Sequence, residues 1–461
     1  MKHITTAFLF SLLVLLPFSC KDPEPEPTET EIINEWIWDV MTDVYLWADD
    51  VDRNLYPTEE TDPEAFFYNI LHADDRFSWI VDDYEELINS FNNISLSSGI
   101  SPYFVRINNT DEVIIIVEYV TPGSPADLGQ IQRGEIITRI NQTTITIENY
   151  INLFYGETLA LEFADYTEGD LVANGKSVTI NAVVLEENPV LHHEIITFEE
   201  KQIGYIVFTG FSEGEQSKWV DSLDHVFADL QNRGISELIM DIRYNPGGRV
   251  SVARHIASVV SPADVPGSDN VFVKYQWNED YQQYFIQRDG ENSENLVVLF
   301  EESPSHNLNL SDIYFLTSGH SASASELIII GLEPYMNVIQ IGENTYGKFY
   351  GSITVPDLEE PARHSWGLQP LVFKFASSTG FTDFNNGLIP DIIIDDNILD
   401  MKQFGDLSDP ILARAVEEIT GVAPEAKKSL QVFPDFTVLS DPVRELKIRS
   451  VADINKAEMV K

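Results

Sequence analysis

The sequence predicts an α/β fold with a mixed sheet, preceded by a β-rich segment and a small helical one. Apolar and aromatic residues recur at helical spacing from 32 to about 95. From 96 to 187 the pattern changes to short apolar runs separated by glycine turns, and from 188 to 421 strand-like and helix-like runs alternate. Such alternation is typical of helices that pack against a sheet.

The N-terminus resembles a bacterial lipoprotein signal. A short basic start precedes the apolar run 7–16, which is too short to span a bilayer, and Cys20 is the only cysteine among the 461 residues. We expect a signal peptide over 1–19, lipidation of Cys20 and an extended Pro/Glu tether over 20–31. The predicted location is the bacterial cell envelope, on the periplasmic or cell-surface side of the outer membrane.

Local signals support each remaining part. Between 32 and 95, Trp36, Val40 and Val44 share helical spacing and predict a packed helical subdomain. In the segment 96–187, strand-like runs flank the turn 122–126. In the segment 188–421 we expect strands at 205–208 and 237–243, helices near 219–230 and 250–260, and a closing helix at 409–420. Residues 422–461 mix proline and lysine breaks with polar positions, and we assign them no role.

Charge excludes several classes of partner. The chain has 75 acidic and 28 basic residues and a formal net charge of −47. Such a surface repels nucleic acid and anionic lipid, so membrane attachment is expected only through the lipid anchor. We expect no metal or cofactor, because the histidines lack ligand spacing and are predicted to lie at the surface. These are His192, His193, His255, His306 and His364.

A serine-rich turn is the principal candidate site. The run 321–326 follows the apolar segment 313–316 and precedes 327–330, which predicts a tight turn between a strand and a helix. Free backbone N–H groups at a helix N-terminus stabilise a developing anion. A serine nucleophile needs a base, and Lys348 lies at the end of another buried-strand pattern, where burial would favour its neutral amine. Without these neighbours the turn would be an ordinary helix cap.

Several segments in order resemble the C-terminal processing peptidases, also called tail-specific proteases. They are S-A-S-A-S-E at 321–326, the pair 347–348, D-I-R-Y-N-P-G-G at 241–248 and G-L-I-P-D at 387–391. The resemblance implies a crotonase-like (ββα) core and a Ser–Lys endopeptidase, with Ser323 as nucleophile and Lys348 as general base. It also implies oxyanion donors at Gly247, Gly248 and Ala324.

The segment 96–187 resembles a PDZ domain, in which the C-terminus of a peptide adds as a strand to a sheet edge. The sequence leaves open whether this groove binds peptide or acts as a spacer. The expected partners are polypeptide substrates, and a peptide-binding groove of this kind would bind them by their C-termini.

Two departures from the family pattern keep alternatives open. Many members have a glutamine four residues after the lysine, where this chain has Ser352 as the candidate assisting residue. His320 stands where a small residue is usual, and it permits a Ser–His esterase hypothesis, although adjacent residues rarely have the geometry for proton transfer. The expected function is an exported serine endopeptidase acting on unfolded or tail-exposed proteins through an acyl-enzyme. The alternative is a non-catalytic lipoprotein that binds peptides or apolar ligands on the same fold.

Overall fold

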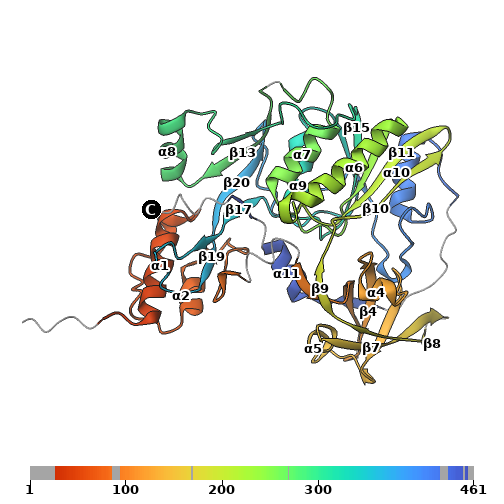
Figure 1. Cartoon of the computed structure of the whole chain (residues 1–461), viewed down its shortest axis with the longest axis horizontal. Helices are drawn as coiled ribbons and strands as arrows, with labels where there is room; N and C mark the ends of the chain where they lie inside the picture. Colours follow the sequence, from red (N-terminus) through yellow and green to blue (C-terminus); the bar gives the residue numbers. More distant parts are fainter. Residues whose placement is uncertain are drawn as a thin grey trace, which may run out of the picture.

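The computed structural model describes residues 26–85, 94–108, 110–167, 170–267, 269–425, 435–449 and 452–454. Figure 1 shows three parts: an N-terminal helical part, a β-rich module (residues 94–186) and an α/β core. Cys20 and the predicted signal peptide lie outside the described residues. In the part of the chain that is described, no helix combines the length and apolar character needed to cross a membrane.

The core is built on a mixed sheet, as the sequence predicts, and this sheet has six strands. Its strand order is β10-β11-β12-β15-β16-β21, and only the β10–β11 pair is antiparallel. The bounds are β10 Val190–Phe198, β11 Lys201–Phe208, β12 Glu237–Asp241, β15 Asp312–Thr317, β16 Asn337–Gly342 and β21 Ile392–Ile393.

Both faces of this sheet are covered by helices. Successive strand residues point to opposite faces, so Ile206 and Met240 join the apolar cluster formed with α6 (Lys218–Arg233), α7 (Val250–Val260) and α9 (Ala324–Leu332). Tyr205 and Ile239 instead pack against α10 (Pro410–Thr420) on the other face. The helices expected at 250–260 and 409–420 are therefore present within a residue of their predicted bounds. Short 3-10 turns η2 (Glu215–Ser217) and η3 (Ile398–Asp400) complete the connections.

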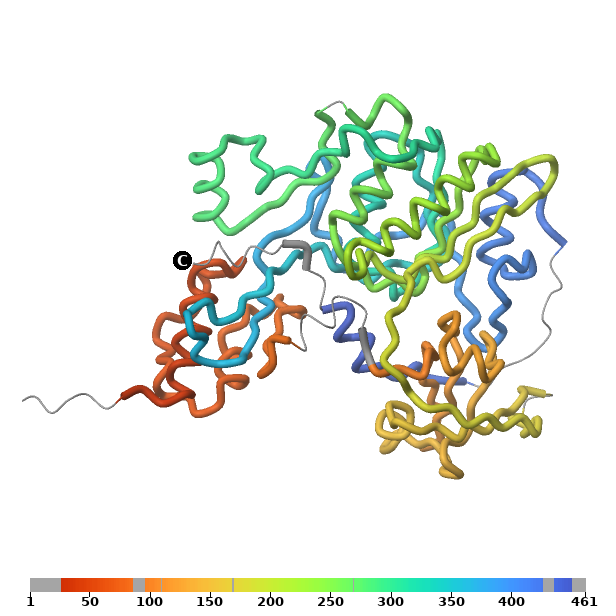
Figure 2. The backbone as a smooth tube through the Cα atoms, viewed as in Figure 1, coloured from red at the N-terminus to blue at the C-terminus, as the bar shows by residue number. Residues whose placement is uncertain are grey.

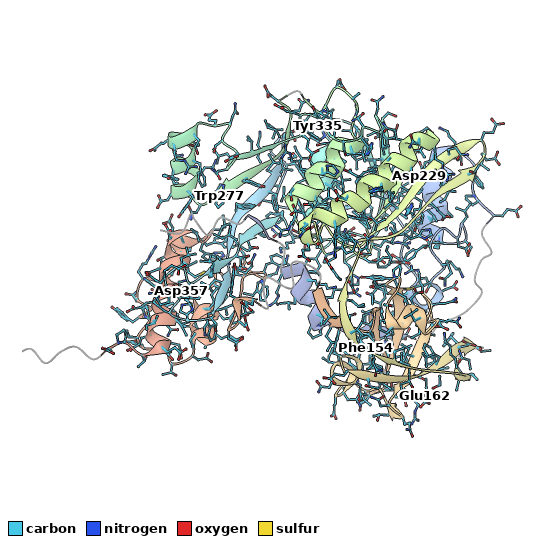
Figure 3. All side chains as sticks on the ribbon, viewed as in Figure 1. Phe154, Glu162, Asp229, Trp277, Tyr335 and Asp357 are labelled. Atoms are coloured by element: carbon cyan, nitrogen blue, oxygen red, sulfur yellow. The ribbon has the colours of Figure 1, made fainter. Side chains whose placement is uncertain are left out.

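A second sheet extends from the core. Its order is β14-β13-β20-β17-β23, and α9 packs between it and the main sheet. Trp277 at the end of β13 packs against α8 in an arm that projects from the core (Figure 3). The bounds are β13 Val271–Trp277, α8 Glu279–Asp289, β14 Val297–Leu299, β17 Tyr350–Ile353, β20 Leu371–Ser377 and β23 Ala452–Ile454.

The N-terminal part differs from its prediction in two ways. Helix α1 (Glu29–Asp43) begins inside the predicted tether, because Thr28 and Glu31 form a capping box. After η1 (Ala48–Asp50) and α2 (Pro63–Ile70), residues 71–83 are not helical. Among them, β1 (Trp79–Val81) joins a three-stranded sheet with β18 (Val355–Pro356) and β19 (Gly367–Gln369). The helices share one apolar cluster with the core, so this part packs directly against the core.

The β-rich module has its own apolar cluster, which includes Phe104 and Phe154. Phe154 is labelled in Figure 3. Its sheet has the order β22-β3-β4-β5-β7-β8, with β6 paired to β5, and β2 pairs separately with β9. The bounds are β2 Ile94–Ser97, β3 Ile100–Ile107, β4 Val113–Val120, α4 Pro125–Leu128, β5 Ile136–Ile140, β6 Thr143–Thr144, α5 Tyr150–Phe154, β7 Thr158–Thr167, β8 Asp170–Asn181 and β9 Val183–Glu186.

The C-terminal residues, to which the sequence assigned no role, connect these parts. Strand β22 (Phe436–Val438) is the edge strand of the β-rich module, and β23 is the edge strand of the second core sheet. Helix α11 (Pro442–Arg449) lies between the module and the core. The dark blue tube in Figure 2 shows β22 and α11.

Candidate active site

The serine-rich turn presents one unpaired hydroxyl. Ser321 Oγ donates to the Ile242 carbonyl at 2.8 Å, and Ser325 Oγ donates to the Asn245 carbonyl at 2.9 Å. Ser323 Oγ is buried and has no hydrogen-bond partner among the described residues. The hydroxyls of the two flanking serines thus bind backbone carbonyls and stabilise the turn, whereas the hydroxyl of Ser323 is free to react.

The backbone of Ser323 is held in a conformation unusual for a residue with a side chain. Ser323 is the N-cap of α9 and has φ 55° and ψ −110°. Such positive-φ conformations cost about 1–3 kcal/mol and persist only where the surroundings impose them. The resulting turn places the Ser323 hydroxyl at the first turn of α9, where the helix dipole favours negative charge.

The 245–248 turn supplies part of that constraint. Ala322 N donates to the Asn245 carbonyl at 3.1 Å, which joins this turn to the serine turn. Gly247 has φ +111°, and a Cβ there would lie 2.9 Å from Ser323 Cβ and 2.8 Å from the Ala322 carbonyl oxygen. Only glycine fits at that distance, as the N-P-G-G motif indicates.

The candidate oxyanion donors are not equivalent. Gly247 N–H donates to Asn245 Oδ1 at 2.9 Å, so this amide is not free to bind a substrate oxygen. Neither Gly248 N–H nor Ala324 N–H has an internal acceptor within the described ranges of the chain. Ala324 is the first residue of α9, where a helical N–H has no acceptor in its own helix. The geometry thus reduces the predicted set of three donors to Gly248 and Ala324.

Lys348 is fully buried in the loop between β16 and β17. Burial lowers its pKa to about 7, although the charge of Glu326 opposes the shift. A substantial fraction of this amine is therefore neutral near physiological pH. Its Nζ donates to the carbonyl oxygens of Ile448 at 2.6 Å and Arg449 at 3.2 Å, and not to Ser323. The predicted base and nucleophile thus lie in adjoining turns without a direct hydrogen bond.

Glu326 joins those two turns. Its Oε2 accepts from Ser323 N and Lys348 N, each at 2.8 Å. Its Oε1 accepts from Thr345 Oγ1 and Gly347 N, each at 2.6 Å. Burial raises the pKa of Glu326 to about 6, and these hydrogen bonds limit the rise. One carboxylate therefore fixes the backbone of the predicted nucleophile relative to that of the predicted base.

Comparison with known proteins agrees with this arrangement. The model of peptidase family S41 matches residues 202–394, and the model of the S41 N-terminal domain matches residues 32–79. The chain belongs to peptidase family S41. The motifs that carry the sequence resemblance all lie inside or at the centre of the matched core.

Two of the relatives found are named as C-terminal processing proteases. The chain is 24% identical to the carboxy-terminal processing protease CtpA of Bacillus subtilis over 60% of its own length and 53% of that protein. It is 24% identical to a carboxyl-terminal-processing protease of Picosynechococcus sp., covering 71% of this chain and 72% of that one. It thus spans about half the length of the Bacillus relative.

A crystal structure of a candidate S41 protease from Bacteroides fragilis has a similar fold. The TM-score is 0.70 at 25% identity, and the alignment covers 84% of this chain and 98% of that chain. The α/β fold with mixed sheets is therefore shared with an S41 structure over nearly its whole length.

Ser352, the candidate assisting residue, lies on β17 and is buried. Its Oγ accepts a hydrogen bond from Gln369 Nε2 at 2.8 Å. Gln369 is itself buried on β19, and its Oε1 accepts from Thr354 at 2.8 Å. In this S41 chain the glutamine next to position 352 therefore comes from a neighbouring strand.

His320 belongs to a different cluster. Its ring lies 5.3 Å from that of Tyr103, and its Nδ1 is 3.2 Å from the Tyr103 hydroxyl. Its Nδ1 also lies 2.5 Å from Arg444. Burial and the Arg444 charge lower the pKa of His320. Contacts of this kind make His320 part of the junction between the module and the core, and they do not support the Ser–His alternative.

The prediction of surface histidines is wrong for His255. Its side chain is buried, with Nε2 2.8 Å from Asp224 and Nδ1 3.2 Å from Glu301. Two carboxylates compensate its burial, which the sequence did not reveal because they are distant along the chain. Among the described residues, no cluster of three or more His, Cys, Asp or Glu side chains could hold a metal ion.

Proposed function

We propose that this chain is an exported serine endopeptidase that cleaves unfolded or tail-exposed polypeptides through a Ser–Lys mechanism. The observation that carries the proposal is the single unpaired hydroxyl of Ser323, held at the start of α9 and joined through Glu326 to the buried Lys348. The names of its S41 relatives support a peptidase that acts near C-termini.

The proposed reaction begins with neutral Lys348. Its amine removes the proton of Ser323 Oγ as that oxygen attacks the scissile carbonyl carbon. The amides of Gly248 and Ala324 stabilise the oxyanion of the tetrahedral intermediate. Protonated Lys348 then gives its proton to the leaving amine as the C–N bond breaks, and water hydrolyses the resulting acyl-enzyme by the same steps.

The surrounding parts have proposed roles of their own. The β-rich module is a PDZ-like domain that receives polypeptide substrates, and the core is of the crotonase-like type. The proposed location is the cell envelope, with Cys20 as the lipid anchor and residues after it as a tether. The position of Gln369 beside Ser352 supports an assisting amide in this region of the protease.

One experiment separates the peptidase from a binding protein. The protein without its predicted signal peptide and tether is incubated with an unfolded protein. The Ser323→Ala variant is incubated in parallel, and the fragments from both are sequenced. The proposal predicts fragments with wild type that are absent with Ser323→Ala. Equal fragmentation by both proteins would exclude Ser323 as nucleophile, whereas binding without fragments would favour the non-catalytic alternative.

A further inference from the structure

The C-terminal residues occupy an edge of the β-rich module. Strand β22 pairs antiparallel with β3, with Val438 opposite Val105 and Phe436 opposite Ile107. Leu439 N donates to the Phe104 carbonyl at 2.8 Å, which continues the ladder beyond the strand. Later residues of the segment thus approach earlier residues of β3. A peptide that adds a strand to a sheet edge makes this kind of ladder.

Side chains of α5 hold the same residues from the opposite side. Leu439 packs against the apolar cluster of the module, which contains Phe104 and Phe154. Tyr155, which follows α5, donates its hydroxyl to the Asp441 carboxylate at 2.6 Å, and Tyr150 donates to the Ser440 carbonyl at 3.1 Å. The segment therefore lies in a groove between β3 and α5, where Leu439 packs on apolar residues and the two tyrosine hydroxyls bind polar groups of the segment.

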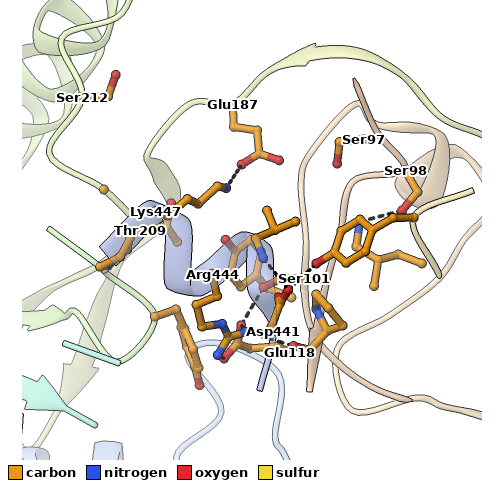
Figure 4. Close-up of a pocket in the computed structure, with 18 of the residues that line it drawn as sticks. Ser97, Ser98, Ser101, Glu118, Glu187, Thr209, Ser212, Asp441, Arg444 and Lys447 are labelled. Carbon is orange, nitrogen blue, oxygen red and sulfur yellow. Dashed lines mark hydrogen bonds and ion pairs between the residues drawn. The ribbon is translucent and has the colours of Figure 1, made fainter. Parts of the chain in front are cut away.

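Helix α11 continues from this groove across the junction with the core (Figure 4). Arg444 Nη2 lies 2.7 Å from Glu118 Oε2, and Lys447 Nζ lies 3.6 Å from Glu187 Oε2. Burial alone would raise the pKa of Glu118, but the Arg444 charge, the contacts with His320 and the Ser101 hydrogen bond together outweigh it, and the pKa falls to about 2. A cavity of about 250 Å³ lies here, lined by Arg444 and Lys447 of α11 and also by Gly248 of the core. The segment thus borders the predicted oxyanion donor.

The end of α11 also contacts the predicted base. The carbonyls of Ile448 and Arg449 accept from Lys348 Nζ. The last carbonyls of a helix have no N–H partner within the helix, and they lie at the negative end of its dipole. They therefore stabilise the ammonium form of Lys348. Beyond them, β23 pairs with β17, where Ala452 is opposite Ser352. An amine held in this way makes no hydrogen bond to Ser323 Oγ.

We propose that residues 435–449, the tail segment, are an intramolecular peptide ligand of the groove between β3 and α5, and that a substrate polypeptide must displace them. The inference deepens the proposed peptidase function and rests on it for the identity of the competing ligand. The preferred ligand is an extended peptide that adds to β3 and places an apolar residue where Leu439 lies. Its binding would release Lys348 from the carbonyls of α11.

The strength of the contacts suits a displaceable ligand. Phe436 and Val438 remain 37% and 43% exposed, so the strand itself buries little apolar surface. The firmest contacts are those of Leu439, Asp441 and Arg444, which lie next to the junction. The strand part of the segment has few buried contacts and therefore opens at lower free energy than the core of the protein, whereas Ile448 at the end of α11 is buried in the core cluster.

The activity test uses Leu439→Asp, which places a charge against the apolar cluster of the module. We expect kcat/KM on an unfolded protein substrate to rise at least tenfold over wild type. Leu128→Asp is the matched control, because Leu128 is 79% exposed on α4 of the same module. An unchanged or lower kcat/KM for a Leu439→Asp variant that keeps the wild-type circular dichroism spectrum would overturn the proposal.

A binding test gives an answer that does not depend on peptidase activity. A fluorescent peptide of residues 435–449 is titrated into Ser323→Ala and into the double variant Ser323→Ala/Leu439→Asp, and anisotropy is recorded. The vacated groove should bind the peptide at least tenfold more tightly than the occupied one, and a peptide with Leu439→Asp should not bind. Equal affinities, or no binding by either protein, contradict the proposal. Tighter binding by the double variant, combined with no cleavage by any variant, would refute the peptidase function alone.

Discussion

Substitution of Glu326 by glutamine removes the group that joins the nucleophile turn to the lysine turn. Each carboxylate oxygen accepts two hydrogen bonds, from Thr345 and Gly347 at Oε1 and from Ser323 and Lys348 at Oε2. A glutamine retains one oxygen, and its NH₂ group would face two donors. Two buried donors would thus lose their acceptor, at about 1–3 kcal/mol each.

An opposing term reduces the expected loss. Burial raises the pKa of Glu326 from 4.5 to about 6, so carrying its charge at pH 7 costs about 2 kcal/mol, which glutamine avoids. The free energy of unfolding at pH 7 should therefore fall by about 2 kcal/mol in Glu326→Gln.

The pH dependence has a defined sign. The pKa of Glu326 is higher in the folded than in the unfolded state. Its contribution to the free energy of unfolding is therefore fully present below about pH 4.5, and it is lost as the pH rises through about 6. The difference in free energy of unfolding between wild type and Glu326→Gln should therefore be about 1 kcal/mol larger at pH 5 than at pH 7.

Urea unfolding followed by circular dichroism at both pH values measures these differences. The exposed Glu157→Gln serves as the control for loss of one charge. A second readout is the pH profile of kcat/KM: the Glu326 charge raises the pKa of Lys348, so Glu326→Gln should move the midpoint to lower pH. Unchanged stability together with an unchanged midpoint would refute the positioning role of Glu326.

Three further predictions concern the same site. Ser321→Ala should lower the free energy of unfolding by about 1–3 kcal/mol because Ser318 N and the Ile242 carbonyl lose a partner, whereas Ser323→Ala should change it by less than about 1 kcal/mol; urea titration compares them. Gly247→Ala should abolish cleavage and destabilise the protein, whereas Gly175→Ala, also at positive φ but in open space, should cost only about 1 kcal/mol; equal losses would contradict the close packing on Ser323. Cleavage should rise with pH around a midpoint near 7, as Lys348 loses its proton, and Lys348→Arg should be inactive at every pH; turnover by that variant would remove the Ser–Lys mechanism.

Much of the core could be predicted because its signals are local. The apolar runs that became β12, β15 and α7, and the serine turn before α9, lie where the sequence pattern places them. The choice of Ser323 came from the family resemblance, and the structure adds that Ser321 and Ser325 are committed to carbonyls.

Other features depend on contacts that sequence patterns do not reveal. The amide of Gly247 donates to the side chain of Asn245. Asparagine side chains often bind the backbone two residues further on, so the N-P-G-G motif could have indicated this hydrogen bond. Glu326 is the only charged residue in an otherwise apolar helical run, which also indicated burial with partners. The tail segment pairs with β3, which lies far from it in the sequence. Two of its apolar side chains are exposed, so the sequence shows no alternation of buried and exposed residues that would predict a strand.

Covalent labelling tests the central claim most directly. Wild type and Leu439→Asp are treated with a fluorophosphonate, which reacts with activated serines, and the modified residue is located by mass spectrometry of peptides. We expect the phosphonyl group on Ser323 in both proteins, faster in Leu439→Asp, and no adduct in Lys348→Arg. An adduct on Ser321 or Ser325, or labelling that persists in Lys348→Arg, would contradict the assignment of Ser323 and Lys348 as nucleophile and base.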